Sequence, residues 1–381
     1  MGLCVHHSLH PNYLNGGCRA SYIIVDSSMK RNILFSIVIQ LILLCSCSEK
    51  VNHVINEVSL NGQIVKVDST NKYIWPKFLF RDILYAWRIN YYGGKLTNNE
   101  WQKSDSLLVS GHGHNEFEHI VLSQDNDGAL FVLNCPMMGD KLISLTKIPH
   151  ADSIAAIKEE SKWKKYDLGQ LPPFWNSGRT FVVLSDSSIL VAGTLVNEIN
   201  HIFSTIDFKN QRAVPLDYWP DDGLKCDSIS KYQLYATQCV LLGNGKGKFL
   251  YKNDWGRVAF IFTIDGHKVN ILSSLYSHTF TKTPPTEQLA CCVNSNRIFM
   301  LLRDSDSKGV KLDKYNEKKT FIFGNTIEIY DWDGVKQQVI HLDKYGQDIM
   351  ISEDSNTLYL FLGYSDDTPE PIIYSYNLNN L

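Results

Sequence analysis

Three histidines in a glycine-rich segment are the first candidates for a metal or ligand site. His112, His114 and His119 follow the pattern His-x-His-x4-His. Imidazole nitrogens bind divalent metals, so a loop that curled on itself could place the three rings around one ion. A repeated connector explains the same glycines without any metal, and no paired cysteine or carboxylate completes a ligand set. We therefore predict no metal, and we keep the three histidines and Trp332 as candidate ligand contacts.

The stretch Gly243–Lys248 reads Gly-Asn-Gly-Lys-Gly-Lys, and its glycines and lysines could cradle a phosphate. A nucleotide site would also require a strand before such a loop and a helix after it. Here Phe249–Tyr251 reads as a strand. The sequence therefore favours a turn.

Asp304, Asp306 and Asp313 could supply oxygen ligands to calcium. Their spacing is not that of an EF-hand, and lysines stand between them. A solvated loop is the simpler interpretation.

The cysteines predict no disulfide framework. The body of the chain beyond Cys47 contains Cys135, Cys226, Cys239, Cys291 and Cys292, which is an odd number. Adjacent side chains of a strand point to opposite faces, so we expect one of the last pair to pack in the core and no bond between them.

Four tryptophans could line a carbohydrate platform, since aromatic faces stack on sugar rings: Trp175, Trp219, Trp255 and Trp332. Packing between structural repeats is the more common role of such residues. The sequence contains no Gly-x-Ser-x-Gly elbow and no dinucleotide fingerprint. We assign no catalytic residue and no cofactor.

Cys47 carries the clearest chemical signal. A positive start, Met29–Asn32, precedes the apolar stretch Ile33–Leu44. About 12 apolar residues match the core of a signal peptide, whereas a membrane-spanning helix needs about 20. The stretch ends in Leu44-Cys45-Ser46-Cys47, which resembles the bacterial lipobox. We predict that the Cys47 thiol receives a diacylglyceryl group and that cleavage before it frees a new amino terminus.

The composition predicts an all-β fold. The chain is 44% hydrophobic and 20% charged, and short runs rich in Val, Ile and Tyr favour pleated, half-buried strands over helices. With 37 basic and 40 acidic residues the net charge is -3, which gives no field that would attract nucleic acid.

Two kinds of hairpin recur along the chain. In one, Thr326–Tyr330 and Val335–Leu342 flank an Asp-Gly turn, and Thr180–Leu184 leads over a polar turn into Ile189–Gly193. In the other, 349–361 resembles 120–132. Their alternation at about 40 to 60 residues predicts the four-stranded antiparallel blades of a β-propeller. The best helical candidate, Ala151–Trp163, reads as one short insertion.

These features divide the chain into four segments. We interpret 1–28 as a mis-assigned upstream extension, because a complete signal peptide, 29–46, follows it. Residues 47–70 form a tether and the approach to the first blade, and 71–381 form the propeller.

The segment Gly111-His112-Gly113-His114-Asn115-Glu116-Phe117 resembles the connector that precedes a blade in TolB-like propellers, relatives of the NHL type. The hairpin Ile327–Gly334 fits the same family. The resemblance implies a lipoprotein with a ring of six blades, the last completed by strands from both chain ends. His112 and His114 depart from the small residues usual in the connector, and seven blades stay open.

We expect an envelope lipoprotein, anchored by lipid and placed in the outer membrane, whose propeller binds or scaffolds envelope proteins or glycans. The alternative is a propeller enzyme, a lyase or hydrolase acting on glycans. A structural partner of an envelope complex is a third possibility and would show a broad apolar patch on one ring face.

Overall fold

The computed structural model describes residues 55–67, 74–88, 90–97, 99–135, 142–223, 226–236, 239–253, 258–277, 288–302, 323–362, 371–379 and 381. The chain divides into two units, Met1–Val54 and Ile55–Leu381, and all described residues belong to the second. Outside them lie Cys47 with the signal segment, Trp255, and the aspartates at 304, 306 and 313. Among the described residues, no helix has the length and apolar character needed to cross a membrane.

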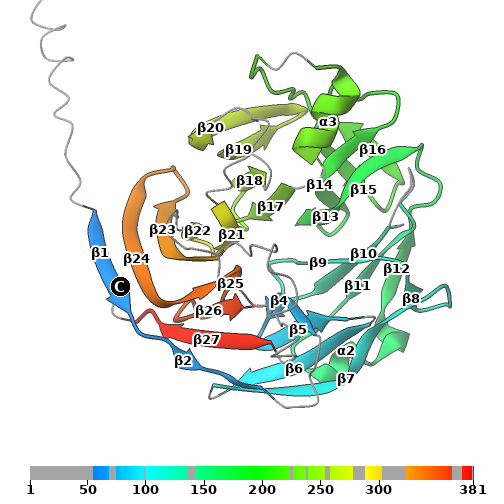
Figure 1. Ribbon diagram of the computed structural model, residues 1–381. Coiled ribbons are helices and arrows are strands. Elements are labelled where there is room, and N and C mark those ends of the chain that lie inside the picture. The colour runs from blue at the N-terminus through cyan, green and yellow to red at the C-terminus, as the bar shows by residue number, and fades with distance from the viewer. Residues whose placement is uncertain are drawn as a thin grey trace, which may run out of the picture. The chain divides into compact units, whose positions relative to one another are not determined.

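The described residues form six β-sheets that follow one another along the chain, and each begins with its innermost strand (Figure 1). We number them in chain order. Sheet 1 contains β4 (Trp75–Phe80), β5 (Ile83–Trp87), β6 (Tyr91–Thr97) and β7 (Glu100–Ser110); sheet 2 contains β9 (Ile120–Gln124), β10 (Leu130–Asn134), β11 (Ser144–Ile148) and β12 (Lys164–Asp167); sheet 3 contains β13 (Phe174–Ser185), β14 (Ser188–Leu195), β15 (Ser204–Asp207) and β16 (Arg212–Pro215).

The later sheets repeat the same order. Sheet 4 contains β17 (Cys239–Gly243), β18 (Phe249–Asn253), β19 (Val258–Asp265) and β20 (Lys268–Ser277); sheet 5 contains β21 (Gln288–Val293), β22 (Arg297–Leu302), β23 (Gly324–Asp331) and β24 (Lys336–Gly346); sheet 6 contains β25 (Asp348–Ile351), β26 (Thr357–Leu362) and β27 (Ile372–Asn377). Successive strands within each sheet pair antiparallel.

The first strands of the unit do not form a sheet of their own. β1 (Asn56–Leu60) pairs parallel with β24, β2 (Gln63–Ile64) pairs antiparallel with β27, and β3 (Lys66–Val67) pairs parallel with β7. We call 56–67 the strap. It gives sheets 1 and 5 an additional, parallel strand and supplies the fourth, antiparallel strand of sheet 6, so sheets 2, 3, 4 and 6 have the expected four antiparallel strands. Sheet 6 thus contains a strand from the start of the folded unit, β2, and three strands from its end, β25 to β27.

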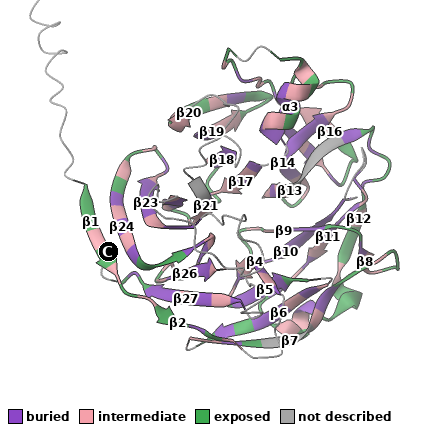
Figure 2. Cartoon of the chain, viewed as in Figure 1, coloured by how far each residue is buried: buried purple, intermediate pink, exposed green. Residues whose placement is uncertain are grey.

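The core consists of six apolar clusters, one between each pair of neighbouring sheets. One of them unites sheet 6 with sheet 1: Phe361 and Ile373 pack with Leu84 and Trp101, all at most 4% exposed. Because the last sheet packs on the first, the sheets close into a ring. Figure 2 shows buried residues along the sheets and exposed ones along β1 and β2. The prediction of an all-β propeller is confirmed.

Helices are few among the described residues. The predicted helix at Ala151–Trp163 is shorter than expected: the α-helix α2 (Ile154–Ile157) is capped by the Ser153 hydroxyl, and a 3-10 turn, η1 (Glu160–Lys162), follows. α3 (Ser228–Ala236) lies in the connection from β16 to β17, and β8 (Glu116–Phe117) pairs with β7.

Candidate functional site

The turn between the first and second strand of every sheet lies at one end of the ring. We call these six turns the inner-turn ring: Arg81–Asp82, Asp125–Ala129, Asp186–Ser187, Asn244–Lys248, Asn294–Asn296 and Ser352–Asn356. Two of them are held by the same device, because Asp125 Oδ1 accepts from the amides of Asp127 and Ala129 (3.0 and 2.7 Å), and Asn244 Oδ1 accepts from those of Lys246 and Lys248 (2.7 and 3.1 Å). The predicted hairpins are confirmed at these turns.

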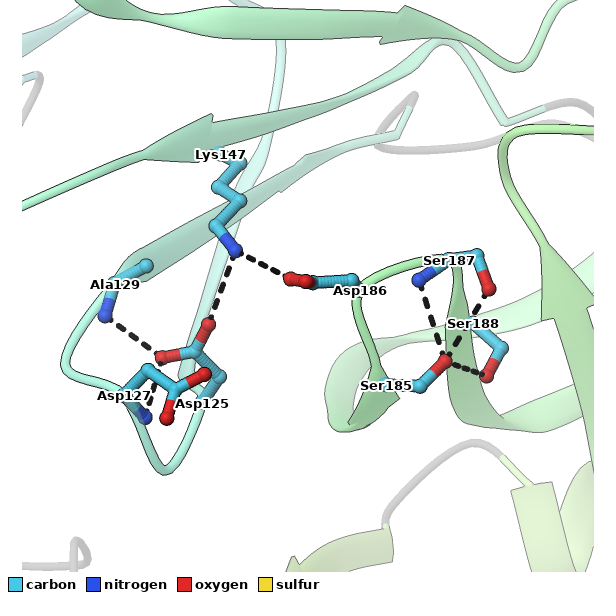
Figure 3. Close-up of polar contacts among 8 residues, drawn as sticks. All are labelled: Asp125, Asp127, Ala129, Lys147, Ser185, Asp186, Ser187 and Ser188. Atoms are coloured by element: carbon cyan, nitrogen blue, oxygen red, sulfur yellow. Dashed lines mark hydrogen bonds and ion pairs between the residues drawn. The ribbon is translucent and has the colours of Figure 1, made fainter.

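Lys147 joins two turns of the inner-turn ring (Figure 3). Its ammonium lies 2.7 Å from Asp186 Oδ1 of sheet 3 and 3.3 Å from Asp125 Oδ2 of sheet 2. Burial lowers the pKa of Lys147, but its bonds to Asp186 and Asp125 outweigh that effect and raise the pKa overall. The same bond holds the pKa of Asp186 below its usual value. Lys147 therefore links sheets 2 and 3 through its bonds to Asp125 and Asp186, and we call this set of three residues the clasp.

One contact crosses the ring. Asn126 Nδ2 of sheet 2 donates to the carbonyl of Gly245 in sheet 4 (3.0 Å), although sheet 3 stands between them. Further contacts link sheet 4 to sheet 5 through Lys246 and Asn296 (3.4 Å), and sheet 5 to sheet 6 through Asn294 and Ser355 (3.0 Å). The inner turns of neighbouring sheets are thus bound to one another, and the Asn126–Gly245 bond reaches past one sheet.

Arg81 occupies a strained position in the inner-turn ring. Arg81 and Asp82 both have positive φ (45° and 60°), a conformation that costs a non-glycine residue free energy. The Arg81 guanidinium lies against Gly128 of sheet 2, where any Cβ would collide with it, and 4.0 Å from Glu353 of sheet 6. This side chain bridges both neighbours of sheet 1.

The suspected phosphate cradle is the inner turn of sheet 4, as the turn prediction required. The amides that could bind an anion already donate to Asn244 Oδ1. The Lys246 and Lys248 ammonium groups contact Asn296 and Asp333 (3.4 and 2.6 Å). The amides and ammonium groups of this turn that could bind an anion therefore already have partners within the protein.

The three candidate histidines lie in the connection from β7 to β9, and their side chains are exposed. His112 Nδ1 is 3.4 Å from Glu118 Oε1, and the carbonyl of His114 accepts from Lys165 Nζ (2.8 Å). Among the described residues, no group of three or more His, Cys, Asp or Glu side chains could hold a metal ion. The glycines have another role: the Glu116 carboxylate accepts from the Gly113 amide (2.8 Å), and a Cβ at Gly111 would collide with that carboxylate.

The two candidate tryptophans whose side chains the structure describes, Trp219 and Trp332, do not gather into a platform. Trp332 is 4% exposed, and its Nε1 donates to the carbonyl of Asn294 (3.0 Å) at the inner-turn ring. Trp219 is half-buried in the β16–β17 connection, where the Lys231 ammonium lies 5.5 Å from its ring centroid. The side chain of Trp175 lies outside the described part. The structure thus separates Trp332 both from Trp219 and from the histidines.

Cys291 and Cys292 pack on opposite faces of β21. Cys291 contacts the cluster between sheets 4 and 5, and Cys292 the one between sheets 5 and 6. Burial raises the pKa of Cys292 well above its usual value. Both are free thiols in the structure.

The opposite end of the ring, which we call the far end, carries longer connections. The β16–β17 connection with α3 lies there, because Asn253, the last residue of β18, donates to the carbonyls of Leu234 and Tyr235 (2.8 and 3.2 Å). Within this connection, Lys231 donates to Asp222 (2.6 Å), and Tyr235 donates to the other Asp222 oxygen (2.7 Å). Sequence reasoning missed this cluster, since its members show no spacing typical of a site.

A second missed cluster lies between sheets 4 and 5. The Glu328 carboxylate accepts from the hydroxyls of Tyr276 and Tyr330 and pairs with Lys336. Burial raises the pKa of Glu328, but the bonds from Lys336 and the tyrosines outweigh it and lower the pKa overall. The cluster ties β20 to sheet 5 with its polar groups paired.

No protein-family model and no curated protein sequence matches this chain. Among solved structures, the β-propeller domain of Cps50 (Swd1) from Myceliophteria thermophila shares 10% identity, with a TM-score of 0.44, covering 84% of this chain and 100% of that chain. The WD40 repeats of RRP9 share 6% (TM-score 0.42; 83% and 97% covered). An auxiliary nutrient binding protein from Bacteroides ovatus shares 8% (TM-score 0.42; 80% and 69% covered). The propeller class itself follows from the ring of sheets in this chain.

Proposed function

We propose that this chain is a lipid-anchored protein of the cell envelope, and that its propeller binds a partner at the far end of the ring. Its six sheets serve as six blades. The partner class is an envelope protein or a glycan, and the membrane is the outer membrane. The connector at Gly111–Phe117 and the strap shared with β27 support the TolB-like type of propeller.

The pairing of the inner turns with one another is the observation that carries the binding proposal. Its charged and amide groups are largely paired with one another, as for Lys147 with Asp125 and Asp186, and Asn126 with Gly245. A ligand bound there would have to replace these contacts. The far end instead presents the β7–β9 and β16–β17 connections. Loops held on a rigid scaffold are the usual place for recognition.

The anchor proposal depends on the segment before the propeller. The positive start, short apolar core and Leu44–Cys47 pattern fit a lipoprotein signal. Nine positions separate Cys47 from the first strand at Asn56, and the stretch that follows Cys47 is polar, so a short tether joins the lipid to the folded unit.

Mass spectrometry of the protein purified from bacterial membranes tests the anchor. We expect an acyl-modified peptide that begins at residue 47 and that is lost in Cys47→Ala. Cys45→Ala is the matched control, because it changes a neighbouring cysteine and leaves the acceptor thiol in place. An unmodified peptide that spans residues 40–50 in the native protein would overturn the proposal.

A further inference from the structure

We infer that the anchored propeller is held with its inner-turn ring toward the lipid bilayer and its far end away from it. This inference rests on the proposed function, because it requires lipid at Cys47. It adds an orientation, and with it the side from which a partner must approach.

The strap begins at the level of the inner-turn ring. Asn56 pairs with Gln338, close to the start of β24. The turn before β24 contacts two inner turns: Asp333 pairs with Lys248 (2.6 Å), and Trp332 donates to Asn294 (3.0 Å). The chain therefore enters the propeller at this end of the ring.

The described C-terminal residues lie at the same level. The Leu378 amide donates to the carbonyl of Asn356 in the inner turn of sheet 6 (2.8 Å). Figure 1 shows the C-terminus beside β1. Both ends of the folded unit thus lie near the inner-turn ring.

The strap leaves little slack after Asn56. Five consecutive residues of β1 pair with β24, and the Gly62 amide donates to Asp343 Oδ1 (2.9 Å). Val65 is 2% exposed, and its amide donates to the carbonyl of Ile373 (2.8 Å). Detaching these residues would break the hydrogen bonds between β1 and β24. The tether length is therefore set by the residues before Asn56.

Lengths decide the orientation. Nine residues span at most about 30 Å when fully extended. Strand β24, with which β1 pairs, runs eight residues from Gln338 to its end at Gly346, which is about 27 Å. A helix such as α3 adds about 10 Å beyond the sheets at the far end. The sum exceeds the reach of the extended tether, so the far end cannot rest on the bilayer.

Adhesion to lipid does not produce this orientation. Among the exposed charges of the inner turns, the carboxylates Asp82, Asp127 and Glu353 outnumber the single ammonium of Lys246, so anionic headgroups would repel this end. The orientation is a consequence of tether length and attachment point, and added salt should leave it unchanged.

Energy transfer in proteoliposomes tests the inference. The full chain, purified with its lipid and carrying Cys226→Ser to remove the exposed thiol, receives a donor dye at Asp127→Cys or at Glu198→Cys. Asp127 is exposed in the inner-turn ring, and Glu198 is exposed just after β14 at the far end. Neutral phosphatidylcholine vesicles carry an acceptor on the headgroup.

We expect transfer to be more efficient from position 127 than from position 198. A flexible Gly/Ser insertion of about 20 residues after Ser48 should reduce that difference, because it more than doubles the reach of the tether. Equal transfer, or stronger transfer from 198, in a protein that is lipidated at Cys47 overturns the orientation alone. Failure of the native chain to join the vesicles overturns the anchor and the orientation together.

Discussion

The two ends of the ring hold their shape in different ways. The inner-turn ring consists of short turns that bind one another across sheet boundaries, as in Asn126 with Gly245 and Lys147 with Asp186. At the far end, the α3 connection is bound to sheet 4 by Asn253, and its polar side chains pair within the connection, as Lys231 does with Asp222. Contacts between sheets fix the ring, whereas contacts within one connection leave it free to differ without disturbing its neighbours.

This difference is consistent with the proposal that a partner binds at the far end. A substitution in a turn that contacts two other sheets would disturb both of them. The inner-turn ring is therefore better suited to holding the sheets together than to binding a partner. A connection that carries its own polar cluster can change its outer surface while the cluster keeps its backbone in place. Binding surfaces are commonly built in the second way.

The largest effect is expected from Lys231→Met in the α3 connection. Lys231 is 8% exposed and donates to Asp222 and to the carbonyl of Pro220, so its loss leaves a poorly exposed carboxylate without its cation. We expect the free energy of unfolding, measured by urea denaturation, to fall by about 3 kcal/mol. Lys246→Met is the control, because that exposed lysine has one long contact to Asn296. Equal losses in both variants would contradict the account.

Gly245→Ala tests the contact across the ring. Gly245 has φ +71°, and a Cβ would collide with Asn126. We expect the free energy of unfolding to fall by about 2 kcal/mol, because the alanine has a strained φ and the hydrogen bond from Asn126 is broken. Gly247→Ala in the same turn has a similar φ of +83° with open space around it, so it should cost only about 1 kcal/mol. In an Asn126→Ala background the two alanine variants should become equal, and a persisting gap would show that the crossing contact is not its cause.

Lys147→Met removes the clasp between sheets 2 and 3. The Asp125 side chain is 11% exposed and would keep only its bonds from the Asp127 and Ala129 amides. We expect a loss of about 1 to 2 kcal/mol in the same urea titration. Asp186→Asn should cost less, because the Asp186 side chain is 72% exposed and stays hydrated without the lysine. The reverse ranking would show that Asp125 does not depend on Lys147.

Acid should weaken the inner-turn ring by a small amount. Hydrogen bonds from Lys147 and from Ser352 hold the pKa values of Asp186 and Asp354 below their usual 3.8. A carboxyl with a lowered folded pKa stabilises the fold above its unfolded pKa, and this stability is lost as the pH falls through the folded value. The double variant Asp186→Asn, Asp354→Asn should therefore lose less stability than the native chain between about pH 5 and pH 3.

In the α3 connection, burial raises the pKa of Tyr218 to about 12, so that phenol loses its proton only in alkali.

Local signals in the sequence predicted much of the fold. The Asp-Gly turn at 333–334 and the polar turn after Ser185 mark hairpins because their residues suit the backbone conformations of tight turns. The strap left no such signal. β2 and β3 contain two residues each, too few for an alternating pattern, and their partners lie more than thirty residues away in the chain.

The contacts that define the two ends could not be predicted from the sequence. Asn126 and Gly245 are 119 residues apart, and Lys147 and Asp186 belong to different sheets. Each residue is ordinary in its own segment, and only the closure of the ring brings the pairs together. The histidine pattern misled for a related reason: the glycines that suggest a metal loop make room for the Glu116 carboxylate.

Paired photo-crosslinking in living bacteria tests most directly the claim that the two ends have different tasks. A photoreactive phenylalanine analogue replaces Glu198 at the far end or Asp127 in the inner-turn ring, both exposed positions. The account predicts a discrete crosslinked product from position 198 that is absent from position 127. A product from position 127 alone would contradict it, because it would place the partner at the end where the turns are bound to one another.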